Sequence, residues 1–164
     1  MASEQRPGAA PGDPAPDATL TDRHGARLRL SELWAASPLV LVFFPLAFSA
    51  TCTRELAALQ GAAASFSARR VRVVGVSVDS HASLAAFADA EGLDLPLLSD
   101  FWPHGEVARA YDAFDERKGW ARRVTVSVDR SGVVRDRFSS GPGEERPLAA
   151  YRASVAALGD PGST

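Results

Sequence analysis

The sequence predicts an α/β fold in which a central mixed β-sheet is flanked by helices. Two short apolar runs are each followed by a segment with helical spacing of its apolar residues, which indicates parallel strands joined by helical crossovers. Later in the chain, two runs separated by a tight turn indicate an antiparallel hairpin. A sheet that combines such crossovers with a hairpin has both parallel and antiparallel strands.

The first strand is predicted at residues 39–44 (LVLVFF), an apolar run between two prolines. Such a run is typical of a strand buried on both faces, and we expect it to be central. The next helix should begin after Ser49 as its N-cap and run to about Arg69. Its apolar stripe recurs at steps of three and four residues and comprises Cys52, Leu56, Leu59, Ala63 and Phe66.

A second strand and helix follow the first pair. The strand is predicted over residues 71–78, and the helix after it should end near Glu91, where Gly92 is a favourable terminator. Its inward face is expected to carry Leu84, Phe87 and Ala88.

The later half of the body changes character. The hairpin should pair residues 123–128 with residues 133–138, and a closing helix is marked by Leu148, Tyr151, Val155 and Leu158. This order of elements is that of a thioredoxin-like fold. Residues 93–122 form an insertion before the hairpin, in which we expect a short helix marked by Val107, Tyr111 and Phe114.

The length of 164 residues corresponds to one domain. Residues 7–16 are rich in proline and glycine without an apolar signal segment, so we expect a flexible leader over residues 1–16. A similar tail is expected over residues 159–164, which leaves residues 17–158 as the single domain.

Composition excludes several classes of protein. The chain is 46% hydrophobic and 23% charged, and its apolar runs are far shorter than the roughly 20 residues that span a bilayer. A net charge of -2 does not supply the positive field that binds nucleic acids. We therefore expect neither membrane nor nucleic-acid partners. The basic residues are almost all arginine, which is typical of a high-GC bacterial genome.

The single cysteine, Cys52, cannot form an internal disulfide, which favours a reducing, cytoplasmic location. A small buried core residue is one interpretation of it. The alternative is a reactive thiol, because Cys52 should lie at the third position of a helix that follows a central strand, where free N–H groups and the helix dipole stabilise a thiolate. The three histidines lack metal-ligand spacing and no nucleotide-binding glycine pattern occurs, so we expect no cofactor.

Residues 45–52 (PLAFSATC) resemble the peroxiredoxin signature Pro-x-x-x-(Thr/Ser)-x-x-Cys at all three fixed positions. The similarity extends from Ala15 through the closing helix. The segments 43–48 (FFPLAF), 96–105 (PLLSDFWPHG) and 128–132 (VDRSG) look most like the alkyl hydroperoxide reductase E class of one-cysteine peroxiredoxins. Within the insertion of residues 93–122, we expect Phe101 and Trp102 to belong to the core rather than to line a pocket.

The resemblance implies roles for five residues. Cys52 would be the peroxidatic nucleophile, Ser49 would bind a peroxide oxygen, and Pro45 would shield the thiolate from water. Arg123, which precedes the strand pattern of residues 124–129 (VTVSVD), would stabilise the thiolate and the departing oxygen, and Glu55 would support the site. For the neighbouring Arg122, a competing candidate, strand alternation predicts the opposite face.

The resemblance further implies a thiol-dependent peroxidase that reduces hydrogen peroxide and organic hydroperoxides through a sulfenic acid on Cys52. An external thiol would regenerate the enzyme, with mycothiol and a mycoredoxin or a thioredoxin-like protein as candidates, and the resemblance implies a homodimer. A redox sensor or partner-binding module is the alternative. A third alternative is a structural subunit with an inert thiol. The joint occurrence of Pro45, Ser49 and Arg123 argues against this alternative.

Overall fold

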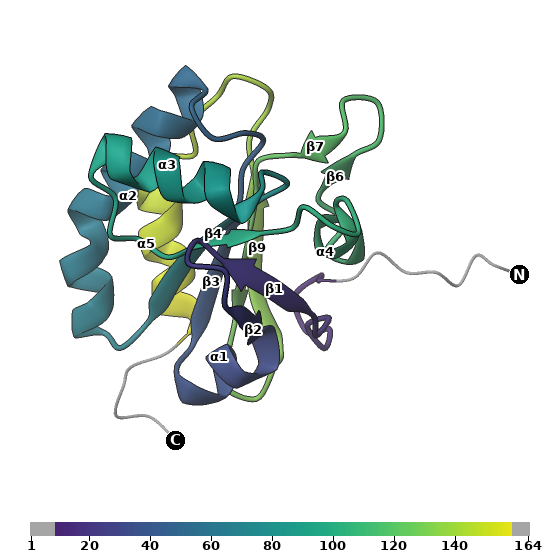
Figure 1. Ribbon diagram of the computed structural model, residues 1–164. Coiled ribbons are helices and arrows are strands. Elements are labelled where there is room, and N and C mark those ends of the chain that lie inside the picture. The colour runs from purple at the N-terminus through teal and green to yellow at the C-terminus, as the bar shows by residue number, and fades with distance from the viewer. Residues whose placement is uncertain (1–8, 159–164) are drawn as a thin grey trace, which may run out of the picture.

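A computed structural model describes residues 9–158. Its main sheet has seven strands in the order β2-β1-β5-β4-β3-β8-β9, and a separate two-stranded sheet joins β6 to β7 (Figure 1). The strands are β1 (Thr19–Asp22), β2 (Arg27–Arg29), β3 (Leu39–Phe43), β4 (Arg72–Ser77), β5 (Leu97–Ser99), β6 (Phe114–Asp115), β7 (Trp120–Ala121), β8 (Val124–Val128) and β9 (Val134–Ser139). The helices are α1 (Leu30–Ala36), α2 (Ala50–Ala68), α3 (His81–Glu91), α4 (Glu106–Ala110) and α5 (Leu148–Ala157).

The predicted mixed sheet is confirmed. Strand β3 pairs in parallel with β4, and β4 pairs in parallel with β5. On its other side β3 pairs antiparallel with β8, which forms the predicted hairpin with β9. All five residues of β3 are buried, as expected for a central strand between two layers of helices.

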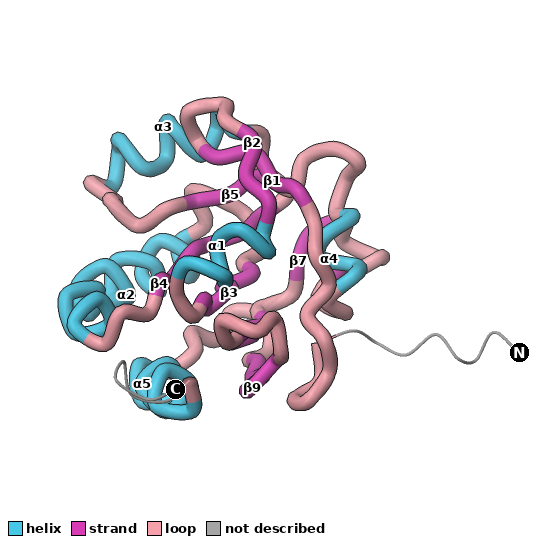
Figure 2. The backbone as a smooth tube through the Cα atoms, turned by 90° about the horizontal axis from the view of Figure 1, so that it is seen from below, coloured by secondary structure: helices cyan, strands magenta, loops and turns pink. Residues whose placement is uncertain are grey.

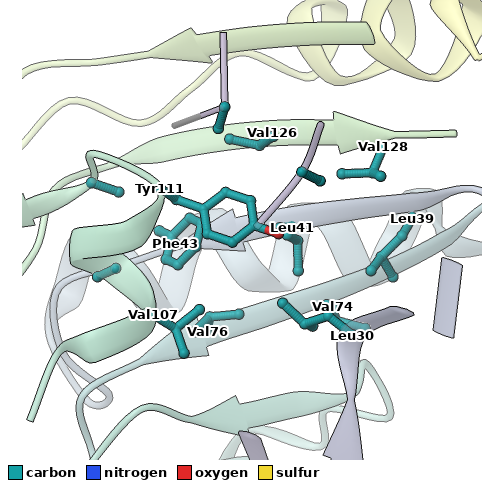
Figure 3. Packing of buried hydrophobic residues seen from close by; sticks show 14 of the residues in the cluster. Leu30, Leu39, Leu41, Phe43, Val74, Val76, Val107, Tyr111, Val126 and Val128 are labelled. Carbon is teal, nitrogen blue, oxygen red and sulfur yellow. The ribbon is translucent and has the colours of Figure 1, made fainter. Parts of the chain in front are cut away.

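The helices cover the sheet on both faces. Alternate β3 side chains enter different core clusters, because successive residues of a strand point to opposite faces. Leu39, Leu41 and Phe43 join the cluster on the side of α1 and α4, where Phe43 packs beside Tyr111 (Figure 3). Val40 and Val42 join the cluster that contains α2, α3 and α5 (Figures 1 and 2).

Helix boundaries agree closely with the sequence pattern. Helix α2 begins after Ser49, and α3 ends at Gly92, whose φ of 64° suits glycine. Two details differ. Ala62 is buried in place of Ala63 on the α2 stripe, and Phe114 lies in β6 beyond the short helix α4.

The expected flexible leader is wrong for residues 9–16. The Gly12 N–H donates to the Val134 carbonyl at 2.8 Å, and the Ala15 N–H donates to the Gly132 carbonyl at 2.7 Å. A proline- and glycine-rich segment therefore lies along the β8–β9 hairpin, because its small residues allow close backbone approach. Residues 1–8 and the predicted tail, 159–164, lie outside the described residues. Within the described residues, no helix is long and apolar enough to cross a lipid bilayer.

The core assignment of Phe101 and Trp102 is also wrong. Phe101 is 52% exposed and Trp102 is 80% exposed, in the segment that connects β5 to α4. Both side chains are therefore available for contacts at the surface.

Candidate active site

The site is built at the start of α2, just beyond the carboxyl end of the central strand β3. Ser49 is the N-cap: its hydroxyl accepts a hydrogen bond from the Cys52 N–H at 3.4 Å, and its carbonyl accepts from the Thr53 N–H at 2.9 Å. Pro45, at the start of the connecting segment, prevents the strand from continuing. Cys52 thus occupies the third helical position, as the sequence predicts, and its side chain is fully buried.

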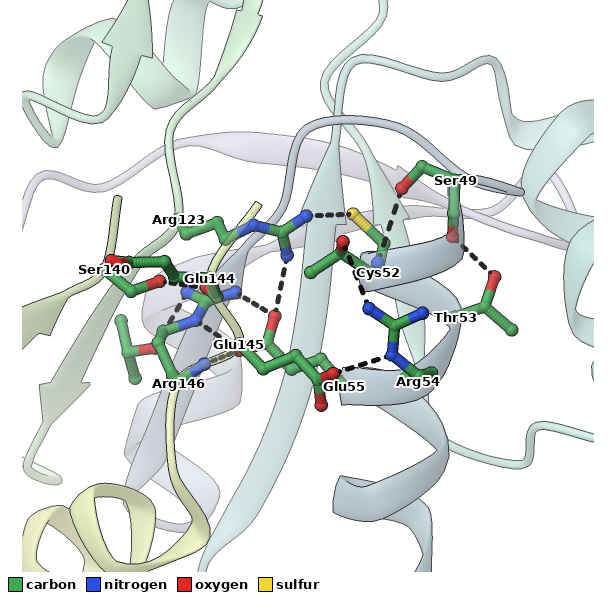
Figure 4. A network of polar contacts seen from close by, with 12 residues as sticks. Ser49, Cys52, Thr53, Arg54, Glu55, Arg123, Ser140, Glu144, Glu145 and Arg146 are labelled. Atoms are coloured by element: carbon green, nitrogen blue, oxygen red, sulfur yellow. Dashed lines mark hydrogen bonds and ion pairs between the residues drawn. The ribbon is translucent and has the colours of Figure 1, made fainter. Parts of the chain in front are cut away.

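Arg123 meets Cys52 from the opposite side. The guanidinium Nη2 donates to the Cys52 Sγ at 3.2 Å, and Nη1 donates to the Glu55 Oε1 at 3.0 Å (Figure 4). Its Nε is buried without a hydrogen-bond partner among the described residues.

Arg122 lies away from this cluster. Its side chain is 46% exposed, and it forms an ion pair with Asp112 at 3.6 Å. Both arginines lie in the turn between β7 and β8, where the Val124 N–H donates to the Arg122 carbonyl at 2.9 Å, so the turn and not strand alternation separates their side chains. Arg123 is the one that contacts the sulfur.

Glu55 has a larger part in the structure than the sequence suggests. It lies one helical turn after Cys52, and its carboxylate is 2% exposed. Arg146, from the segment between β9 and α5, contacts it three times: from its backbone N–H at 2.8 Å, from Nε at 2.7 Å and from Nη2 at 2.7 Å (Figure 4). The Tyr151 hydroxyl donates to the same carboxylate at 3.1 Å.

These contacts determine the ionisation of Glu55. Burial alone would raise the pKa of its carboxyl, but the hydrogen bonds and charge of Arg146, with the charge of Arg123, lower that pKa below the ordinary value. Two guanidinium groups therefore face one carboxylate, which leaves a net charge of +1 in the cluster before the sulfur is counted. A thiolate on Cys52 would neutralise this charge.

Sequence reasoning missed Arg146, Tyr151 and Thr125. The hydroxyl of Thr125, in β8, accepts from the Arg146 Nη1 at 3.0 Å and so fixes the far end of that guanidinium. One signal was available: Glu55 shares a helical face with Cys52 and Leu59, and a carboxylate on a buried face requires a cationic partner. Nothing in the sequence selects that partner among 18 lysines and arginines.

A pocket of about 350 Å³ opens beside the cluster. Pro45, Ser49 and Arg123 line it, together with apolar groups that include Leu46 and Trp120. The predicted residues Pro45, Ser49 and Arg123 therefore border one space. Among the described residues no group of His, Cys, Asp and Glu side chains could hold a metal ion.

The arrangement suits a reaction in which charge leaves the sulfur. A buried sulfur beside a guanidinium and at a helix N-terminus can be held as a thiolate, which is the nucleophilic form of cysteine. Arg123 and the Ser49 hydroxyl line the pocket and can donate to an oxygen that gains charge there. Nucleophilic attack on a small, polarisable oxygen compound fits this set of groups.

Comparisons with known proteins agree with this chemistry. Residues 11–137 match the model of the AhpC/TSA family. Alkyl hydroperoxide reductase E of Mycobacterium tuberculosis is 40% identical over 147 residues, which are 90% of this chain and 96% of the relative. The crystal structure of peroxidoxin BcpB from the same organism has a TM-score of 0.79 and 31% identity, and covers 92% of this chain and 96% of that one. Enterococcus faecalis AhpC has a TM-score of 0.82 and 26% identity, over 90% of each chain. The chain therefore belongs to the AhpC/TSA family, which confirms the resemblance of its sequence to the peroxiredoxins.

Proposed function

We propose that this protein is a one-cysteine, thiol-dependent peroxidase that reduces hydrogen peroxide and organic hydroperoxides. The observation that carries the proposal is the 3.2 Å contact between the Arg123 Nη2 and the buried Cys52 Sγ at the start of α2. The pocket of about 350 Å³ is larger than hydrogen peroxide requires and is partly apolar, which supports organic hydroperoxides as further substrates.

In the proposed reaction the Cys52 thiolate attacks one peroxide oxygen in line with the O–O bond. The S–O bond forms as the O–O bond breaks, the cysteine is oxidised to sulfenic acid, and the departing oxygen takes a proton to leave as water or an alcohol. Arg123 stabilises the thiolate and the departing oxygen, and Ser49 donates its hydroxyl to a peroxide oxygen. Pro45, which has no N–H, limits the access of water, and Glu55 orients Arg123.

Regeneration in this proposal uses a thiol from outside the chain, because Cys52 is the single cysteine. The thiol forms a mixed disulfide with Cys52 and releases water, and a second thiol then restores the free cysteine. Mycothiol with a mycoredoxin, or a thioredoxin-like protein, are the proposed reductants, and we propose the cytoplasm as the location since a single reduced cysteine suits it.

Peroxide consumption in the presence of an external thiol tests the proposal. The Cys52→Ser variant should have no activity above background, because a serine hydroxyl is far less acidic than a thiol and no general base lies beside it among the described residues. Activity that survives in this variant would contradict the assignment. A wild-type protein that becomes oxidised once but does not turn over with any thiol would instead favour the redox sensor or partner-binding alternative.

We also propose a homodimer, which the resemblance to peroxiredoxins implies. Three large apolar side chains of the described residues are exposed: Phe48 (57%), Phe101 (52%) and Trp102 (80%). Phe48 follows β3, while Phe101 and Trp102 follow β5, so all three extend from the same edge of the parallel strands. A second copy that buries these aromatics would explain their exposure. Sedimentation velocity should show a dimer that Trp102→Glu converts to a monomer, and a monomeric wild type would overturn this proposal.

A further inference from the structure

The segment that connects β3 to α2 holds an unfavourable backbone conformation. Phe48, directly before the helix cap Ser49, has a φ of 69°, a left-handed value that bulky residues rarely adopt. Such a conformation persists only where surrounding contacts determine it. The segment also carries Pro45 and Ser49 to the pocket, so whatever holds Phe48 also determines where these two groups lie.

One side chain, just beyond the end of the neighbouring strand β4, holds this segment. The carboxylate Oδ2 of Asp79, two residues after β4, accepts a hydrogen bond from the Ala47 N–H at 2.8 Å. The same oxygen accepts from the Ser77 hydroxyl at 2.6 Å. The Asp79 carbonyl accepts from the Ser99 hydroxyl, in β5, at 2.6 Å. Asp79 is therefore tied to two adjacent parallel strands, and the backbone of Ala47 is tied to Asp79.

A second contact fixes the other side of the strained residue. The ring of Phe48 packs edge-on against Phe87 of α3, with ring centroids 5.1 Å apart. Ser49 then caps α2. The backbone is thus held immediately before Phe48 by Asp79 and immediately after it by the helix cap, so a shift at Ala47 would be transmitted to Ser49 within two residues.

From these contacts we infer that Asp79 is a positioning residue for the peroxidase site: through the Ala47 N–H it holds the strained connection that places Ser49 and Pro45 opposite Arg123. This inference rests on the proposed peroxidase function. Asp79 does not border the pocket, so it acts on the position of the donors and not on the substrate itself. It should therefore affect the reaction with peroxide much more than the reactivity of Cys52 toward reagents that do not need those donors.

Two reactions of Cys52 separate positioning from stability. Oxidation by hydrogen peroxide depends on the placed donors, whereas alkylation by iodoacetamide depends chiefly on a reachable thiolate. For Asp79→Ala we expect peroxide oxidation to fall about tenfold to a hundredfold, since a displacement of about 1 Å at a reacting group can cost a hundredfold. Alkylation should be unchanged or faster. Asp79→Asn, whose amide oxygen can still accept from the Ala47 N–H, should retain most of the rate.

Asp89→Ala is the matched control, because Asp89 is an exposed carboxylate on α3 and its loss changes the net charge equally. Urea unfolding of each variant shows that the measured protein is folded, and Asp79→Asn serves where Asp79→Ala does not fold. The inference is overturned if folded Asp79→Ala oxidises at the wild-type rate, if both reactions fall by the same factor, or if Asp79→Asn loses as much as Asp79→Ala. A wild-type protein that does not consume peroxide would instead overturn the proposed function.

Discussion

Replacing Arg123 by alanine should slow the oxidation of Cys52 by about a hundredfold or more. The substitution removes a charged donor that lies 3.2 Å from the sulfur, on a side chain that is only 5% exposed. In a water-excluded site the loss of one such donor typically raises the barrier by about 3 kcal/mol, which corresponds to roughly a hundredfold in rate. The fold should survive, because Glu55 keeps its contacts with Arg146 and Tyr151.

Stopped-flow oxidation followed by tryptophan fluorescence measures this effect directly. Arg122→Ala is the matched control: it removes the same charge one residue earlier, from a side chain that also lines the pocket but is 46% exposed, is paired with Asp112 and does not contact the sulfur. Its rate should stay within a few-fold of the wild type. Arg123→Lys should fall between the two, because one ammonium group cannot reproduce the planar fork that reaches both Glu55 and Cys52. A larger loss for Arg122→Ala than for Arg123→Ala would refute the assigned roles of the two arginines.

Three further predictions concern stability and oxidation. Arg146→Ala should lower the free energy of unfolding by about 3–5 kcal/mol in urea titrations, because it removes the main cationic partner of the buried Glu55 carboxylate. Arg152→Ala, on the exposed face of α5, should leave the free energy of unfolding nearly unchanged. Burial raises the pKa of the Asp100 carboxyl from 3.8 to about 6, in spite of the hydrogen bonds that it accepts from the Val107 and Ala108 N–H groups. The folded state therefore binds this proton more tightly than the unfolded state does. The free energy of unfolding should fall as the pH rises from 3.8 to about 6. Asp100→Asn should lose that slope, and an identical slope in both proteins would contradict the shift. Excess peroxide without thiol should convert Cys52 to sulfinic acid, which mass spectrometry would detect as two oxygens added to the intact protein. When a small thiol is present, the trapped species should instead be a mixed disulfide between that thiol and Cys52. A predominant Cys52–Cys52 disulfide between subunits would contradict the one-cysteine mechanism.

The sequence predicted those parts of the fold in which buried apolar residues recur at the period of a strand or a helix. Strand β3 and helix α2 carry apolar residues at the periods of a buried strand and a one-sided helix, so both their type and their limits follow from the sequence. Strand alternation selected Arg123 over Arg122, but both residues lie in the turn before β8, so that reason was wrong although Arg123 does contact Cys52. Strands β1 and β2 escaped prediction because they have four and three residues, of which β1 fully buries only Leu20 and β2 none, its Leu28 being partly buried.

The unpredicted parts of the site depend on contacts between segments far apart in the chain. Arg146 lies 91 residues from Glu55, and its burial results from the way the segment after β9 folds across α2. Asp79 reaches Ala47 because β3 and β4 are neighbours, but its hydrogen bond has no periodic signature in the sequence. Local patterns therefore identified the groups that meet the sulfur, whereas the groups that orient them required the tertiary structure.

The charge of the cluster explains why a buried ion network suits this site although such networks contribute little to stability in general. A pair of one arginine with Glu55 would be neutral, so it would offer the sulfur a hydrogen bond but no net positive charge. The second guanidinium, that of Arg146, satisfies Glu55 and leaves the charge of Arg123 free to interact with Cys52. In the proposed reaction the sulfur loses its negative charge when it becomes a sulfenic acid, so the positive charge of the cluster is then no longer balanced. In that reaction the cluster would favour the thiolate over the sulfenic acid, because only the thiolate balances the charge of Arg123 3.2 Å from the sulfur.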